Sequence, residues 1–269
     1  MGKGGRLLNP TGKAKVLSPV RPNAGTAAEY RRRLDRLVGE MTASLDYWIA
    51  AAYRANEPAT MAQDRSATAE LNIVVKRLAR RWTRRFADMA NDLAGWFARS
   101  TAERADGSFQ AALKKGGMTV KFKMTAAQND AVQAVLAENV GLIKSIAARH
   151  LESVQGAVMR AVSGGQDLRA LSLELQKIGG VTKRRAAFIA RDQCNKATAV
   201  IVKTRQQEMG VTEATWQHST AGKHPRPSHV AASGKRYLIA DGMVLDGERV
   251  WPGTAINCRC VSRSIIPGL

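Results

Sequence analysis

Apolar side chains recur every three or four residues along most of the first 210 positions, a spacing typical of helices that bury one face. The first such stripe lies within residues 27–55, and a longer one runs from 71 to 96. A third stripe, from 126 to about 162, follows Thr125-x-x-Gln128, which resembles a capping box at the start of a helix. This part of the chain is therefore predicted to be helical.

Glycines predict where the later helices end. Gly179-Gly180 follows a short apolar-periodic segment over 167–178 and predicts a glycine cap there. Thr182 is then expected to cap a further helix, which ends at Gly210.

Two segments carry strand signals instead. Residues 106–124 contain turn glycines and an alternating run, which predicts a small hairpin. After Gly210 the strand-like runs are 212–218, 236–240 and 259–265, with the turn dipeptides Asp241-Gly242 and Asp246-Gly247 between the last two. The predicted fold is mainly α: a long-helix N-terminal region, followed by a small C-terminal α+β domain with a short antiparallel sheet.

These patterns divide the chain into three segments. Residues 1–25 are rich in Gly, Pro, Lys and Arg and predict an extended basic arm that becomes ordered only on a partner. Residues 26–165 form the helical region, which includes the hairpin at 106–124. Residues 166–269 form the C-terminal domain.

The charge of the chain narrows the choice of partners. Its 42 Lys and Arg residues outnumber 22 Asp and Glu residues, for a net charge of +20, so nucleic acid is the first partner to consider. Six cations flank the second apolar stripe and are predicted to contact phosphates, although a solvated helix face is the alternative. They are Lys76, Arg77, Arg80, Arg81, Arg84 and Arg85.

Membranes and secretion are not favoured. No 18-residue apolar run is evident, and the basic residues 1–25 lack the apolar stretch of a signal peptide. Three cysteines, an odd number, argue against a disulfide framework. A protein of a reducing compartment, or of an assembly made in one, is expected, with no membrane partner.

The last 80 residues carry a series of motifs in a fixed order. Ala190-Arg191-Asp192-Gln193 and Asn195 are followed by Gly210, Trp216, Arg226-Pro227-Ser228-His229, Gly234, Pro252-Gly253 and Asn257-Cys258-Arg259-Cys260. In order and spacing this segment resembles the head morphogenesis domain of phage Mu F-like minor head proteins. The resemblance implies structural roles for Arg191, Asn195, Trp216, Arg226, His229, Gly234, Asn257, Cys258 and Cys260.

The resemblance also implies a function. Proteins of this family are minor capsid components of tailed phages that assist head assembly inside the capsid near the portal, and some travel with the DNA. The expected partners are therefore the portal protein, the major capsid protein and packaged double-stranded DNA. A portal–capsid adaptor without DNA contact is one alternative, and a nuclease or thiol hydrolase acting in the host is another.

His229, Cys258 and Cys260 are the candidate chemical site. The favoured hypothesis is a hydrogen-bonded lock in which Arg191 and Asn195 hold the loops and the cysteines are small buried side chains. Zinc, with His218 or His224 as a fourth ligand, is a less favoured alternative, because one residue between two thiolates makes shared coordination awkward. A Cys258–Cys260 disulfide is least favoured. Because the motifs of known hydrolases are missing, no catalytic residue and no obligatory cofactor are expected.

Overall fold

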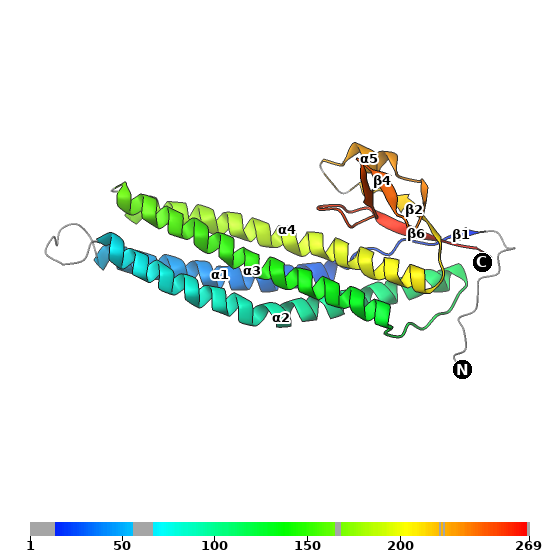
Figure 1. Ribbon diagram of the computed structural model, residues 1–269, viewed down its shortest axis with the longest axis horizontal. Helices are drawn as coiled ribbons and strands as arrows, with labels where there is room; N and C mark the ends of the chain where they lie inside the picture. The colour runs from blue at the N-terminus through cyan, green and yellow to red at the C-terminus, as the bar shows by residue number, and fades with distance from the viewer. Residues whose placement is uncertain (1–13, 56–66, 165–167, 221, 223, 268–269) are drawn as a thin grey trace. The chain divides into compact units, whose positions relative to one another are not determined.

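The computed structural model describes residues 14–55, 67–164, 168–220, 222 and 224–267. Four long helices come first: α1 (Ala24–Ala55), α2 (Ala67–Gly116), α3 (Ala126–Ser163) and α4 (Leu168–Glu208). Short strands and the small helix α5 (Pro227–Ala231) follow them (Figure 1). The predicted fold class, mainly α with a small C-terminal region of short antiparallel sheets, is confirmed.

The C-terminal strands form two antiparallel sheets. The larger has the order β1-β6-β2-β3, from β1 (Lys15–Val16), β6 (Val261–Ile266), β2 (Glu213–Gln217) and β3 (Arg236–Leu238). The smaller pairs β4 (Met243–Leu245) with β5 (Glu248–Val250). Asp246 and Gly247 both have positive φ, 53° and 81°, as a two-residue hairpin turn requires.

The chain forms two compact units. The described residues of the first fall within Met1–Ala27, Gly95–Leu136 and Arg191–Leu269, and the second comprises Ala28–Ala94 and Ala137–Ala190. Helices α2, α3 and α4 each contribute to both units. The second unit is helical, and the predicted stripe of α2 supplies buried Leu71, Val75, Leu78, Trp82 and Phe86 to its core.

Helix α3 has the length and composition to cross a membrane. An 18-residue window within Ala126–Ser163 has a mean hydropathy of 1.3, so the expectation that no such segment exists was wrong. Ile143, Ile146 and Val154 of this helix are buried in the protein. A helix packed in a protein core can have the same length and composition.

The predicted hairpin at 106–124 is wrong. Helix α2 continues to Gly116, and residues 117–125 form no strand. Asp106 accepts two hydrogen bonds from Arg205, at 2.9 and 2.7 Å, and this long-range contact holds it within the helix. Phe122, part of the alternating run, packs on Phe109 with ring centroids 5.7 Å apart. Phe122 is therefore held by packing and not by strand pairing, whereas Met124 at the end of the run is 64% exposed.

The predicted helix end at Gly179-Gly180 is also wrong, because α4 passes through both glycines. Gly179 lies where a Cβ would stand 2.9 Å from Thr42 Cγ2, so the residue permits close packing against α1. Thr182 is not a cap. Its hydroxyl donates to Ile178 O at 3.0 Å and lies 2.8 Å from His150 Nδ1.

The N-terminal arm is ordered in the part that the structure describes. Strand β1 pairs with β6, and Leu17 N donates to Ser264 O at 2.9 Å. Leu17 and Val20 are buried, and this apolar anchoring is why the arm needs no partner for its order from residue 14 onward. Residues 1–13 lie outside the described residues.

Candidate functional site

His229, Cys258 and Cys260 meet in the first compact unit. His229 lies on α5, which begins at Pro227 in a position that suits the fixed φ of proline. The two cysteines lie just before β6, in residues without regular secondary structure. All three side chains are buried, with 5% or less of each exposed.

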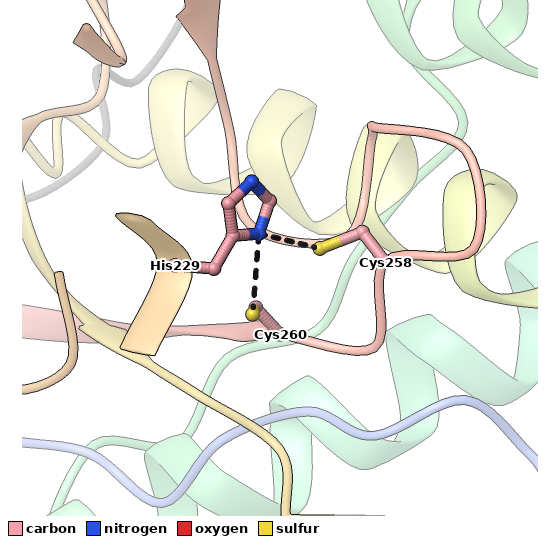
Figure 2. Close-up of side chains that lie close together, drawn as sticks. All are labelled: His229, Cys258 and Cys260. Atoms are coloured by element: carbon pink, nitrogen blue, oxygen red, sulfur yellow. Dashed lines mark hydrogen bonds between the residues drawn. The ribbon is translucent and has the colours of Figure 1, made fainter. Parts of the chain in front are cut away.

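The geometry of this His/Cys cluster is compact. His229 Nδ1 lies 3.5 Å from Cys258 Sγ and 3.7 Å from Cys260 Sγ (Figure 2). The ligand atoms of the three residues all lie within 4.8 Å of one another. Both cysteines are free thiols, so the disulfide alternative is not what the structure contains. The sequence prediction that these three residues converge is confirmed.

Trp216 holds the histidine ring in place. Its indole packs edge-on against His229, with centroids 5.2 Å apart and planes at 86°. Trp216 lies on β2 and is fully buried. Gly234, at φ 85°, donates its N–H to Trp216 O at 2.8 Å, so the predicted motif glycine forms the turn that returns the chain from α5 toward β3.

Asp192 fixes the start of the cysteine segment. Its carboxylate accepts a hydrogen bond from the Asn257 backbone N–H, and Asn257 has the left-handed φ of 57° that asparagine tolerates. Asp192 lies inside the Ala-Arg-Asp-Gln motif, but the sequence alone did not indicate this contact, which joins residues 65 positions apart.

Two further contacts anchor the loops. Arg226 donates to Ile256 O at 3.0 Å, and Ser228 donates to Asp246 Oδ2 at 2.6 Å. Sequence reasoning had not found the Ser228–Asp246 contact, because it joins residues on two different loops. Asp241 instead forms an ion pair with Arg249, with Oδ1 3.6 Å from the guanidinium Nη1.

Comparison with known proteins identifies this part of the chain. Residues 152–263 match the family described as Phage Mu protein F like protein. These residues contain α4, β2, α5 and the whole His/Cys cluster. This segment is similar to that family, and we call residues 152–263 the Mu F-like region.

One relative resembles the chain over nearly its full length. A protein of Haemophilus influenzae named only as uncharacterized is 28% identical over 264 residues, which is 97% of this chain. The chain spans 58% of the length of that relative. No solved structure matches the chain.

The Mu F-like region contains a cavity beside the cluster. The cavity has a volume of about 540 Å³, and His229, Cys258 and Cys260 form part of its wall. Arg191, His218 and His224 also line it. Arg191 is exposed at the surface. Asn195 lines a separate small pocket with Trp251 and Tyr237.

The two thiols of the Mu F-like cluster influence each other. A hydrogen bond from the Cys260 thiol lowers the pKa of Cys258. The same contact, together with burial, raises the pKa of Cys260.

The basic face predicted on α2 lies outside the matched region. Lys76, Arg77, Arg80, Arg81, Arg84 and Arg85 are all exposed on this helix. Five of them, all but Lys76, line one surface hollow together with Asp88 and Met89. Arg85 lies 2.8 Å from Glu40, and within the described part of the chain the other five form no ion pair.

Proposed function

We propose that this protein is a minor capsid component of a tailed phage that takes part in head morphogenesis inside the capsid, next to the portal. The observation that carries the proposal is the match of residues 152–263 to the phage Mu F-like family. Trp216, Cys258 and Cys260 of that region are buried beside His229, as expected of a structural core.

The portal and the inner surface of the major capsid protein are the proposed protein partners. Co-expression with the portal protein of the same phage, followed by size-exclusion chromatography, tests the first contact. Assembled heads treated with protease test the position, because a protein inside the head is protected until the head is opened. Digestion in intact heads contradicts the internal position.

We further propose that the basic face of α2 contacts packaged double-stranded DNA. The spacing of Arg77, Arg81 and Arg84 places them on one side of the helix, and all three are exposed. Phosphate contacts of this kind are independent of sequence and weaken linearly on a plot of log affinity against log salt. Ejection of the protein with the DNA is part of the same proposal.

Binding to random duplex DNA as a function of salt tests the DNA contact. Changing Arg77, Arg81 and Arg84 together to Gln should reduce the steepness of log affinity against log salt by about 2.7, since each phosphate contact contributes about 0.9 to this slope. Arg31, Arg32 and Arg33 on α1 are a matched control, because they pair with Asp35 or Glu29.

The outcomes separate the hypotheses. Equal slopes for the two triple variants contradict a DNA contact at this face. If the α2 variant instead loses portal binding and keeps its DNA affinity, the protein is an adaptor whose charge meets an acidic protein surface.

We propose no enzymatic role for the cluster. A thiol nucleophile must reach its substrate, and Cys258 and Cys260 are 3% and 5% exposed. Nucleases that use hard divalent cations need oxygen ligands, whereas this cluster offers one nitrogen and two sulfurs. Nuclease and hydrolase assays of the protein beside its His229→Ala variant test this, and activity lost in the variant would revive the enzyme hypothesis.

A further inference from the structure

We propose that His229, Cys258 and Cys260 bind one zinc ion, with a water molecule in the fourth position. This inference concerns the chemistry of the cluster and does not depend on the proposed role in head assembly. It replaces the hydrogen-bonded lock that the sequence favoured.

The distances suit a tetrahedral zinc ion. With Zn–S near 2.3 Å and Zn–N near 2.0–2.1 Å, tetrahedral geometry separates a sulfur from a nitrogen ligand by roughly 3.5 Å. The Nδ1–Sγ distances are 3.5 and 3.7 Å. An ion can therefore enter the cluster with only small shifts of the side chains.

The one-residue spacing of the cysteines is no obstacle. Cys258 and Cys260 precede β6 in residues without regular secondary structure, and both thiols point to the same nitrogen of His229 (Figure 2). The histidine reaches them from a different element, α5. The three ligands thus approach one point from two separate segments.

Hydrogen bonding alone cannot join both thiols directly to His229 Nδ1. A neutral imidazole nitrogen that accepts a hydrogen bond has one lone pair, yet two thiols face His229 Nδ1. One ion bound to Nδ1 and both thiolates would satisfy all three atoms together. Thiolate and imidazole ligands favour zinc over magnesium or calcium.

A second buried group is suited to metal-bound thiolates. The Trp216 indole N–H is fully buried and has no hydrogen-bond acceptor within the described structure. A metal-bound Cys260 thiolate would accept this N–H, as groups around metal ligands commonly do.

The surrounding contacts hold the ligand segments in place. Asp192 binds the backbone of Asn257 beside Cys258, Arg226 binds Ile256 O, and Ser228 beside His229 binds Asp246. Such anchoring is what positions metal ligands before the ion binds.

The fourth position faces the cavity. Among the described residues, no fourth His, Cys, Asp or Glu belongs to the group of ligand atoms within 4.8 Å. His218 and His224 line the cavity but lie outside this group. Water is therefore the expected fourth ligand, and His218→Ala and His224→Ala should each keep the metal.

The test uses the full chain and two metal probes. Protein purified without chelator is analysed for zinc, and metal-free protein is titrated with Co²⁺. We expect one zinc per chain, and with Co²⁺ we expect a thiolate charge-transfer band and tetrahedral visible bands. Cys258→Ser, Cys260→Ser and His229→Asn should each weaken Co²⁺ binding at least tenfold. Cys194→Ser is the matched control, since Cys194 is buried away from the cluster and contacts Asn23 O.

A second measurement on the unmodified protein guards against variants that fail to fold. A chelator should lower the melting temperature and should increase the reaction of Cys258 and Cys260 with a thiol reagent, located by mass spectrometry. Zinc below a tenth of an equivalent together with no Co²⁺ bands overturns the proposal. Unchanged Co²⁺ affinity in folded Cys258→Ser also overturns it.

Discussion

Single buried polar residues carry much of the specificity of the first compact unit. Arg205 is the clearest case, because its side chain is 3% exposed and makes four hydrogen bonds. Two go to Asp106, one to Glu208 and one to Lys123 O, and the two acidic partners raise its pKa in opposition to burial, with Asp106 the larger contributor. Glu208 is a local partner three residues away, whereas Asp106 and Lys123 lie 99 and 82 residues away, where no local pattern in the sequence indicates them.

Removing the Arg205 guanidinium should strongly destabilise the folded protein. Arg205→Ala leaves Asp106 and Glu208 partly buried without their cation, so we expect the free energy of unfolding to fall by about 3–5 kcal/mol. Denaturant titration measures this. Arg236→Ala is the control, since Arg236 is exposed and 4.0 Å from Glu213, and we expect less than about 1 kcal/mol. Equal effects in both variants contradict the prediction.

His150 should make stability depend on pH. It is 2% exposed, and burial lowers its pKa from 6.5 to about 4. Between pH 4 and 6.5 the unfolded chain therefore binds a proton at His150 that the folded chain does not bind. The stability that the neutral imidazole contributes is complete above pH 6.5 and is lost as the pH falls toward 4. The loss should reach about 3 kcal/mol.

Replacing His150 by Asn isolates this contribution. An amide can keep a hydrogen bond to Thr182 but does not titrate. Denaturant titrations between pH 7 and 4 should give a shallower decline for His150→Asn than for the unmodified protein. Parallel curves would mean that other groups cause the acid sensitivity.

At the scale of elements, apolar periodicity predicted where the helices lie, whereas turn glycines predicted only some of the helix ends. The predicted cap at Thr125 is confirmed, because Gln128 N donates to Thr125 Oγ1 at 3.1 Å. The stop at Gly210 is confirmed too, with φ 72° and the backbone bonds of a helix cap. Gly179-Gly180 carries a similar local signal but lies within α4, so a glycine pair alone does not end a helix.

The two glycines of that pair should respond oppositely to alanine. Gly180→Ala meets only the flexible end of Arg184, at 3.5 Å, so gained helix propensity should stabilise the protein by about 0.5–1 kcal/mol. Gly179→Ala meets Thr42 Cγ2 at 2.9 Å, and overpacking should destabilise it by about 1–3 kcal/mol. Thermal unfolding of both variants checks the signs. Stabilisation by both would show that close packing at Gly179 is unimportant.

At the scale of the molecule, the first unit joins segments from both ends of the chain. Strand β1 covers the edge of β6 (Figure 1), and Arg263 Nε donates to Leu17 O at 3.1 Å. This closure buries Leu17 and Val20 and leaves no unpaired edge on that side of β6 in the described sheet.

Shortening the N-terminus should therefore lower stability sharply once β1 is removed. A chain starting at Pro22 loses β1 and the burial of Leu17 and Val20, which should lower stability by about 3–5 kcal/mol. It also exposes a strand edge that favours aggregation. A chain starting at Ala14 keeps all described contacts and is the control. Equal melting temperatures and equal solubility for the two chains would show that β1 is dispensable.

The sequence by itself determined the helical stripes, the C-terminal strands and the resemblance to the phage Mu F-like family, because periodicity and motif order are local properties of the chain. It also predicted that His229, Cys258 and Cys260 converge. Only the tertiary structure decided that Asp192 anchors Asn257, that α2 and α4 continue through their glycines, and that β1 joins β6. Local preferences amount to about 1 kcal/mol per residue, so packing and buried hydrogen bonds between distant segments override them.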